Sequence, residues 1–357
     1  MRAKPPSARV LPTHTPELFA TAVREAVALL RAGELVALPT ETVYGLAANA
    51  LDARAVARIF TAKRRPAVNP IIVHVADLKM ARQCAADWPE VADRLGAAFW
   101  PGPLTLVVHR ARGVPDQVTA GGPTVGVRWP SHPFISAVIR ECGFPLAAPS
   151  ANVANELSPT TAEHVHRSLG DRIRLIVDGG PAQVGIESTV LDIVAQPPQV
   201  LRPGMIHAES LVAVIGAVRG PDDRVASKGA LRSPGRLPRH YGPKAALIVL
   251  SWASESELRR RLAELGLDAS GCHVIAHTIV PSGAGYGGVS VVPHDAAAFA
   301  RALYAELHRC DAAGARVILV EAVPDSLEWQ GIADRLRRAA APAADFPSVS
   351  SGDATNG

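Results

Sequence analysis

A short apolar run at residues 35–38 leads directly into the polar stretch PTETVY at residues 39–44. A run of this kind, bounded by a turn, is typical of a buried strand. Ligands of open sheets of strands and helices bind beyond the carboxyl ends of the strands, so the hydroxyls of Thr40, Thr42 and Tyr44 are candidate ligand groups. A plain polar turn between a strand and a helix explains the same residues equally well.

Four later stretches share this design, because each places small hydroxyls or a cation beside an apolar strand. They are Lys63-Arg64-Arg65-Pro66 with Asn69 and His74, residues 124–128 (TVGVR), residues 149–152 (PSAN), and Glu187-Ser188-Thr189 with Arg202. The recurrence favours one binding site assembled from several strand ends.

Each of these groups also has an ordinary structural explanation. Lys63 and Arg65 suit the negative end of a helix, and Ser150 or Asn152 could cap the helix that follows. Arg128 lies within an apolar strand, where a buried cation needs an anionic partner. That partner is either a structural carboxylate or the carboxylate of a substrate. The remaining alternatives are a core histidine for His74, a turn residue for Ser188 and a surface cation for Arg202.

The length of 357 residues and the hydrophobic content of 48% suit two domains with cores of their own. No apolar run reaches the roughly 18 residues of a membrane span, and the first residues lack the apolar stretch of a signal peptide. The four cysteines are scattered, as expected for buried thiols in a reducing compartment. We therefore expect a cytoplasmic protein without membrane contact.

The distribution of charge favours an anionic ligand. The net charge is +4, and residues 217–243 carry six Lys and Arg against two Asp and Glu. This excess is too small to predict a nucleic-acid surface by itself.

The pattern of elements predicts an α/β fold of the mixed α+β kind. In residues 1–216, strands and helices mix without strict alternation, which predicts a twisted mixed open sheet flanked by helices. Residues 217–243 are rich in Gly and Pro and form a linker. Residues 244–340 alternate strands and helices, as in a small doubly wound, Rossmann-like α/β domain. Residues 341–357 have the composition of a disordered tail.

Several familiar catalytic motifs are missing. The glycine-rich residues 282–288 precede a predicted strand rather than a helix, so we predict a flexible loop there and not a dinucleotide site. The sequence has no G-x-x-x-x-G-K-[ST] phosphate loop, no G-x-S-x-G elbow and no Cys or His pair with zinc spacing. Any ATP must be held by other groups.

Taken in order, the motifs resemble those of the YrdC family, and the layout of linker and second domain resembles its long, two-domain form. The likeness covers residues from about 18 to 340. It implies the YrdC type of sheet and the condensation of L-threonine, bicarbonate and ATP to threonylcarbamoyl-adenylate and pyrophosphate. In this family the product serves the threonylcarbamoyl modification of adenosine next to the tRNA anticodon. Downstream tRNA threonylcarbamoyl transferase proteins, and a weak tRNA contact, are the implied partners.

The resemblance also implies a set of ligands in this sequence. Threonine would be bound by Thr42, His74, Arg128, the backbone of Ala148, and Ser188. ATP would be bound by Arg65, Asn69, Thr124, Ser150, Ser158, Arg202 and Tyr241, with Mg²⁺ on the triphosphate and no metal ligand from the protein. Lys63 would lie beside the phosphates, and Lys63, Arg65, Ser150 and Asn152 would make up the catalytic group. The extra arginine Arg64 is the one departure from the pattern.

The linker belongs to the same hypothesis. Residues 233–243 combine cations with Tyr241, and by resemblance they would cover the cleft of the first domain. Two other functions stay open: an RNA-binding module without catalysis, and a regulatory or ribosome-assembly factor that kept the fold. Pyrophosphate release that needs both threonine and bicarbonate would separate these functions.

Overall fold

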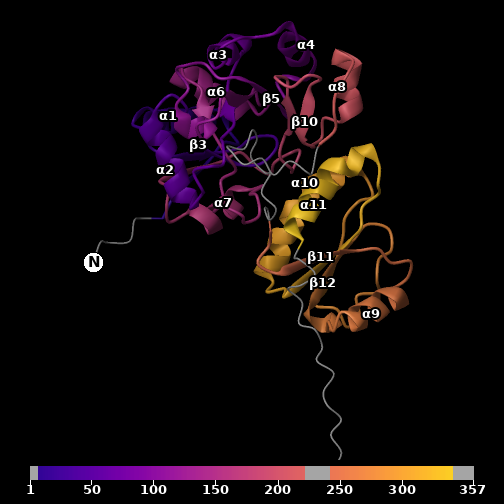
Figure 1. Ribbon diagram of the computed structural model, residues 1–357. Coiled ribbons are helices and arrows are strands. Elements are labelled where there is room, and N and C mark those ends of the chain that lie inside the picture. The colour runs from indigo at the N-terminus through magenta and orange to yellow at the C-terminus, as the bar shows by residue number, and fades with distance from the viewer. Residues whose placement is uncertain (1–6, 222–241, 341–357) are drawn as a thin grey trace, which may run out of the picture.

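The computed structural model describes residues 7–221 and 242–340, which form two sheets with flanking helices (Figure 1). The first sheet has ten strands in the order β1-β8-β2-β3-β7-β4-β6-β5-β9-β10, and the second has four in the order β11-β14-β12-β13. Of the predicted linker, residues 222–241 lie outside the described chain, and so do the tail and Tyr241.

The first sheet mixes parallel and antiparallel pairs, as predicted. For example, β2 pairs antiparallel with β3 and parallel with β8. The strands are β1 (Arg9–Pro12), β2 (Val36–Leu38), β3 (Gly45–Asn49), β4 (Val73–His74), β5 (Leu104–His109), β6 (Thr124–Arg128), β7 (Leu146–Ala147), β8 (Leu175–Asp178), β9 (Thr189–Asp192) and β10 (Gln199–Arg202).

The helices of this domain begin at side-chain caps in several places. Thr15 caps α1, with Pro16 at its first position, and Asp52 caps α2. The helices are α1 (Pro16–Arg31), α2 (Ala53–Lys63), α3 (Leu78–Gln83), α4 (Glu90–Phe99), α5 (Asp116–Thr119), α6 (Pro133–Cys142), α7 (Ala162–Leu169) and α8 (Ala208–Ile215).

The sequence pattern does not predict five elements of this domain: β1, β3, β10, α5 and α7. The sequence of β3, GLAAN, lacks β-branched and aromatic residues, so only its pairing with β2 and β7 makes it a strand. The polar stretch after residue 38 therefore connects two strands, so the alternative of a turn between a strand and a helix is wrong. The apolar run at residues 71–75 predicts a longer strand than the structure has, because only Val73–His74 pair.

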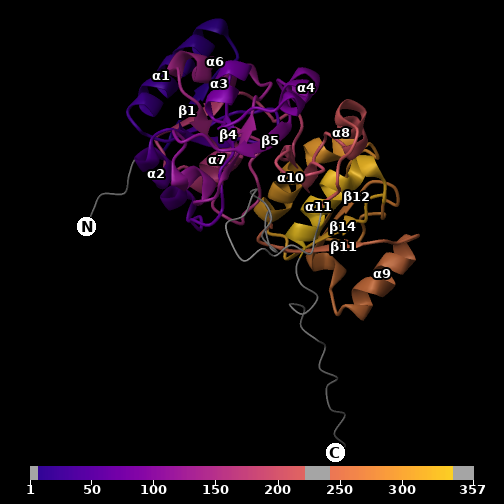
Figure 2. The same ribbon diagram turned by 45° about the horizontal axis from the view of Figure 1, so that its top comes forward.

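The second sheet is entirely parallel, as the doubly wound prediction requires. Its strands are β11 (Ala246–Leu250), β12 (Cys272–Ala276), β13 (Gly288–Val291) and β14 (Val317–Glu321). Helix α9 (Glu255–Glu264) covers one face, and α10 (Ala296–Ala312) and α11 (Gln330–Ala339) cover the other, toward the first domain (Figures 1 and 2). Residues 282–287 form the predicted loop before β13.

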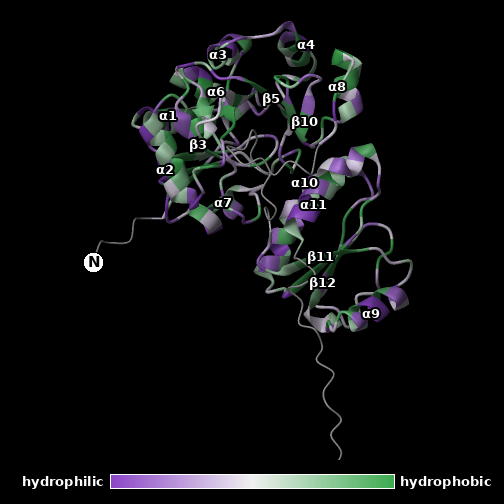
Figure 3. Ribbon diagram, in the orientation of Figure 1, coloured by the Kyte–Doolittle hydropathy of each residue, from purple (hydrophilic) through white to green (hydrophobic). Residues whose placement is uncertain are grey.

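The two domains share a hydrophobic cluster. Val43, Leu157 and Ile186 of the first domain pack in one cluster with residues of α10 and α11 such as Leu303 and Ile332. Strands β11 and β12 are mostly hydrophobic green in Figure 3, whereas α9 carries hydrophilic residues. Within the described residues, no helix combines the length and the apolar character needed to cross a membrane.

Candidate active site

A cavity opens at the strand ends of the first domain. Its volume is about 540 Å³ when the part open to solvent is counted. It is lined by Thr40, Thr42, Val43, Gly45, Arg65, Ile71, Ile72, His74, Arg128, Ala148, Pro149, Ser150, Glu187, Ser188 and Arg202. The structure thus brings together residues from all five sequence stretches.

Arg128 lies at the end of β6 and is held by three groups of the protein. Its Nη2 lies 2.6 Å from Oε1 of Glu41, its Nη1 donates to Thr42 Oγ1 at 2.9 Å, and its Nε donates to the carbonyl of Gly102 at 3.2 Å. The side chains of Arg128 and Glu41 are each only 4% exposed. A structural carboxylate therefore accompanies this cation, whether or not a substrate carboxylate joins it.

The Glu41 carboxylate is charged in this site. Burial alone would raise its pKa, but the charge of Arg128 and its hydrogen bonds outweigh burial and lower the pKa. Ser131 N donates to Oε1, while Oε2 has no hydrogen-bond partner within the described residues. The sequence predicts no role for Glu41, because its position in the chain does not show that it meets Arg128.

Hydrogen bonds of the Thr40 hydroxyl stabilise the turn that carries Thr42. Thr40 Oγ1 donates to the carbonyl of Val43 at 2.6 Å and accepts from the amide of Thr42 at 3.2 Å. The two hydroxyl oxygens lie 3.0 Å apart. Thr42 Oγ1 is therefore fixed between Thr40 and Arg128.

His74 lies beside Arg128, because β4 and β6 are parallel neighbours that pair these two residues. Burial, followed by the charge of Arg128, lowers the pKa of His74 to about 3. The ring is therefore neutral near neutral pH. Its Nδ1 has no hydrogen-bond partner in the described parts of the chain, so His74 offers an uncharged polar group to the cavity.

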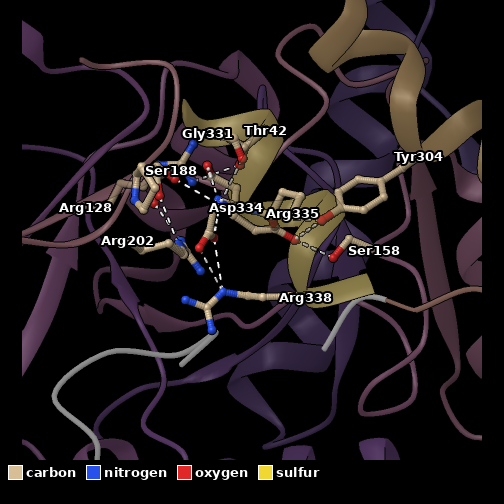
Figure 4. Close-up of polar contacts among 12 residues, drawn as sticks. Thr42, Arg128, Ser158, Ser188, Arg202, Tyr304, Gly331, Asp334, Arg335 and Arg338 are labelled. Atoms are coloured by element: carbon tan, nitrogen blue, oxygen red, sulfur yellow. Dashed lines mark hydrogen bonds and ion pairs between the residues drawn. The ribbon is translucent and has the colours of Figure 1, made fainter. Parts of the chain in front are cut away.

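Ser188 and Arg202 meet on another wall of the cavity (Figure 4). Arg202 donates from Nε to the carbonyl of Ser188 and from Nη2 to its Oγ, both at 3.1 Å. Oγ also lies 2.8 Å from Thr105 Oγ1. Sequence analysis missed Thr105, since a threonine inside an apolar strand gives no signal of this contact.

Lys63 does not line the cavity. At the end of α2 its ammonium donates to the carbonyls of Ser150 and Asn152, both at 2.5 Å, and to Asn152 Oδ1 at 3.2 Å. Burial lowers its pKa well below the usual lysine value. Asn152 in turn donates from Nδ2 to the carbonyl of Glu156. In this structure Lys63 and Asn152 thus hold the segment that carries Ser150, and their roles at ATP stay predictions.

Of the remaining predicted ATP ligands within the described residues, one lines the cavity and three do not. Arg65 lines the cavity and donates to the carbonyls of Asn69 and Pro70. Asn69 and Thr124 are buried outside the cavity lining. Ser158 is also outside it and donates to the carboxylate of Glu187. Ala148, which is a predicted threonine ligand through its backbone, also lines the cavity. Its amide donates to the carbonyl of Ile72.

The lining therefore combines three cations, Arg65, Arg128 and Arg202, with small hydroxyls and a neutral histidine. Cations fixed by backbone and hydroxyl contacts suit a carboxylate or phosphate ligand. No group of three or more His, Cys, Asp or Glu that could hold a metal ion occurs within residues 7–221 and 242–340. The arrangement suits the binding of anionic substrates that also carry hydroxyls.

Comparison with known proteins identifies both domains. A family model described as "Telomere recombination" (Sua5/YciO/YrdC) matches residues 28–204, and a model described as "Threonylcarbamoyl-AMP synthase, C-terminal domain" matches residues 206–341. The chain is 40% identical over 329 residues to the threonylcarbamoyl-AMP synthase of Pyrococcus abyssi, covering 89% of this chain and 93% of the relative. It is 46% identical over 234 residues to that of Bacillus subtilis, covering 65% and 68%.

The solved structures agree with these relatives. The crystal structure of P. abyssi Sua5 complexed with L-threonine superimposes with a TM-score of 0.83 at 37% identity, covering 92% of this chain and 96% of that one. The chain therefore belongs to the Sua5/YciO/YrdC family, in the long form that carries a second, C-terminal domain.

Proposed function

We propose that this chain synthesises threonylcarbamoyl-AMP from L-threonine, bicarbonate and ATP and releases pyrophosphate, for the threonylcarbamoyl modification of tRNA adenosine next to the anticodon. Relatives that cover most of this chain are named for this synthase activity. A structural neighbour at 37% identity binds L-threonine. The observation that carries the proposal is the cavity in which Arg128, Thr42, His74 and Ser188 converge.

The threonine half of the site is built around Arg128. A guanidinium has five N–H donors. In Arg128, Nε and Nη1 each donate one hydrogen bond to the protein, while Nη2 lies beside Glu41 but donates no hydrogen bond within the described residues. The remaining donors suit the carboxylate of threonine. Thr42, Ser188 and the uncharged ring of His74 are polar groups for the substrate's hydroxyl and amine, and neutral His74 would not repel an ammonium or compete for the carboxylate.

The nucleotide half would use Arg65, Arg202 and Ser150, which line the same cavity. Asn69, Thr124, Ser158 and Tyr241 complete the proposed set of ATP ligands by resemblance. We expect Mg²⁺ to arrive on the triphosphate, with phosphate oxygens as its main ligands. Lys63 would act indirectly, because its ammonium fixes the backbone on either side of Ala151.

The reaction needs positioning and cationic stabilisation more than a nucleophilic side chain. A bond forms between the threonine amine and the bicarbonate carbon with loss of water, and an oxygen of the resulting carbamate displaces pyrophosphate from the α-phosphorus. Negative charge builds on the phosphates, where Arg65 and Arg202 would stabilise it. Cavity walls that exclude water would also protect the labile carbamate.

The test is identification of the product. The full chain, incubated with ATP, Mg²⁺, L-threonine and isotopically labelled bicarbonate, should form threonylcarbamoyl-AMP that carries the label, as seen by mass spectrometry. An RNA-binding module without catalysis would yield no labelled nucleotide. Transfer of the label to tRNA should require added downstream transferase proteins.

A further inference from the structure

Helix α11 of the C-terminal domain reaches the cavity wall of the first domain through one side chain, Arg335 (Figure 4). Its side chain is fully buried. Arg335 Nε donates to Oε2 of Glu187 at 2.7 Å, and Nη2 donates to the backbone carbonyl of the same residue at 3.1 Å. Glu187 lines the cavity next to Ser188, so one guanidinium fixes both the side chain and the backbone of this segment.

The same guanidinium also holds a second segment of the wall. Arg335 Nη1 donates to the carbonyl of Pro203 at 2.9 Å, one residue after Arg202. Because Arg202 bonds the hydroxyl and carbonyl of Ser188, Arg335 joins the two chain segments whose side chains meet in the cavity. A change in its position would shift Ser188 and Arg202 together.

The surroundings of Arg335 fix it in this place. Asp334 accepts from its Nη1 at 2.9 Å, and Arg338 donates to Asp334 at 3.0 Å. Helix α11 approaches closely because Gly331 faces Gly204, where an added Cβ on Gly331 would lie 3.0 Å from the Gly204 Cα. On the other side, Tyr304 of α10 donates to Oε2 of Glu187 at 3.2 Å. The C-terminal domain therefore supplies both an arginine and a tyrosine to a carboxylate of the cavity wall.

We propose that Arg335 is a positioning residue for the synthase site: it holds the Glu187-Ser188 segment and Arg202 in the arrangement that binds substrate. The second domain is then part of the active-site architecture, in addition to being the attachment of the linker. This inference rests on the proposed function.

The charge of Glu187 provides a readout that a general loss of stability would not change. Burial would raise the pKa of Glu187, but the charges of Arg335 and Arg202 and the hydrogen bond from Ser158 outweigh it and lower the pKa. The other groups that face Glu187 are Tyr304 and, through its charge, Lys63. Without Arg335, Glu187 would take up a proton at higher pH than in the parent.

The experiment compares Arg335→Met and Arg335→Lys with Arg337→Met in the full chain, using threonine- and bicarbonate-dependent pyrophosphate release. Arg337 is a control for the loss of an arginine from the same helix. Its side chain is 61% exposed and lies 3.9 Å from Asp334, so the control also measures the effect of losing an exposed ion pair to the residue that contacts Arg335. We expect Arg335→Met to lower kcat/KM for threonine at least tenfold and to move the acid limb of the pH profile to higher pH. Arg335→Lys should fall between Arg335→Met and the parent, and Arg337→Met should match the parent.

The proposal is overturned if both Arg335 variants have the same kcat/KM for threonine and the same acid limb of the pH profile as Arg337→Met. If circular dichroism shows that Arg335→Met does not fold, Arg335→Lys decides: parent-like kinetics and pH profile overturn the proposal, and an intermediate loss supports it. If the parent chain shows no pyrophosphate release that depends on threonine and bicarbonate, the proposed function is contradicted instead. In that case calorimetric titration with L-threonine would test the positioning role. Weaker threonine binding by the Arg335 variants than by the parent would support it, and equal binding would overturn it.

Discussion

Replacing Arg128 with methionine should affect stability and threonine binding by separate routes. The change removes the cation that accompanies Glu41, and both side chains are 4% exposed in the parent. Removing one partner of a buried ion pair costs about 3–5 kcal/mol, because the remaining charge is left uncompensated. Loss of a desolvated contact to the substrate carboxylate should cost about 2 kcal/mol or more, or roughly a 30-fold weaker affinity.

A second substitution separates the two effects. Glu41→Gln removes the stranded charge while its side-chain oxygen can still accept from Ser131 N. The double variant Arg128→Met/Glu41→Gln should therefore recover most of the unfolding free energy but none of the threonine affinity. Urea denaturation measures the first quantity and calorimetric titration with L-threonine measures the second.

The stability loss should also depend on pH. In the parent, the lowered pKa of Glu41 means that the pair stabilises the fold above the usual glutamate pKa and that this contribution is lost as pH falls through the lowered pKa. In Arg128→Met, burial raises the pKa of Glu41. The charged, unpaired carboxylate then destabilises the fold above the usual glutamate pKa, and this destabilisation disappears as Glu41 is protonated at lower pH. The difference in unfolding free energy between the parent and Arg128→Met should thus decrease from pH 7 to pH 4. Parent-like threonine affinity in the double variant would refute the role of Arg128 in substrate binding.

Three further predictions follow from the site. Lys63→Met should lower the unfolding free energy by about 2 kcal/mol or more, because the carbonyls of Ser150 and Asn152 lose their donor. Urea denaturation measures this loss beside the control Lys79→Met, which alters an exposed lysine, and a Lys63→Met variant as stable as the parent and the control would contradict the prediction. The imidazole protons of His74 should keep one chemical shift from pH 5 to pH 8, since its pKa is about 3, and a titration within that window by NMR would disprove the neutral ring. Valine should be used at least about 100-fold less well than threonine in kcat/KM, with serine between them, because a site that bonds a substrate hydroxyl rejects analogues without it; equal turnover of valine and threonine would exclude this selection.

The stretches that form the cavity wall are predictable from the sequence because each places small hydroxyls or a cation beside an apolar strand. Thr42, His74, Arg128, Ser188 and Arg202 belong to these stretches, and all five line one cavity. Their ligand roles stay predictions. The mixed sheet and the doubly wound second sheet were also predictable, since hydrophobic periodicity and element order determine them.

The partners of these groups were not predictable, because they depend on contacts between distant segments. Arg128 meets Glu41 across 87 positions of the sequence, and Arg335 meets Glu187 across 148. By resemblance Lys63 would lie beside the phosphates, yet in the structure its ammonium donates to the Ser150 and Asn152 carbonyls. Strand β3 was missed for the same reason, since pairing rather than propensity makes it a strand.

If one cavity binds threonine and ATP and joins them through bicarbonate, pyrophosphate release should need both co-substrates. The measurement uses the full chain with ATP and Mg²⁺ in buffers depleted of carbon dioxide, with threonine alone, with bicarbonate alone, and with both. We expect rapid release only when both are present, and a lower rate in Arg128→Met at limiting threonine. Release at the same rate without threonine or without bicarbonate would contradict this expectation.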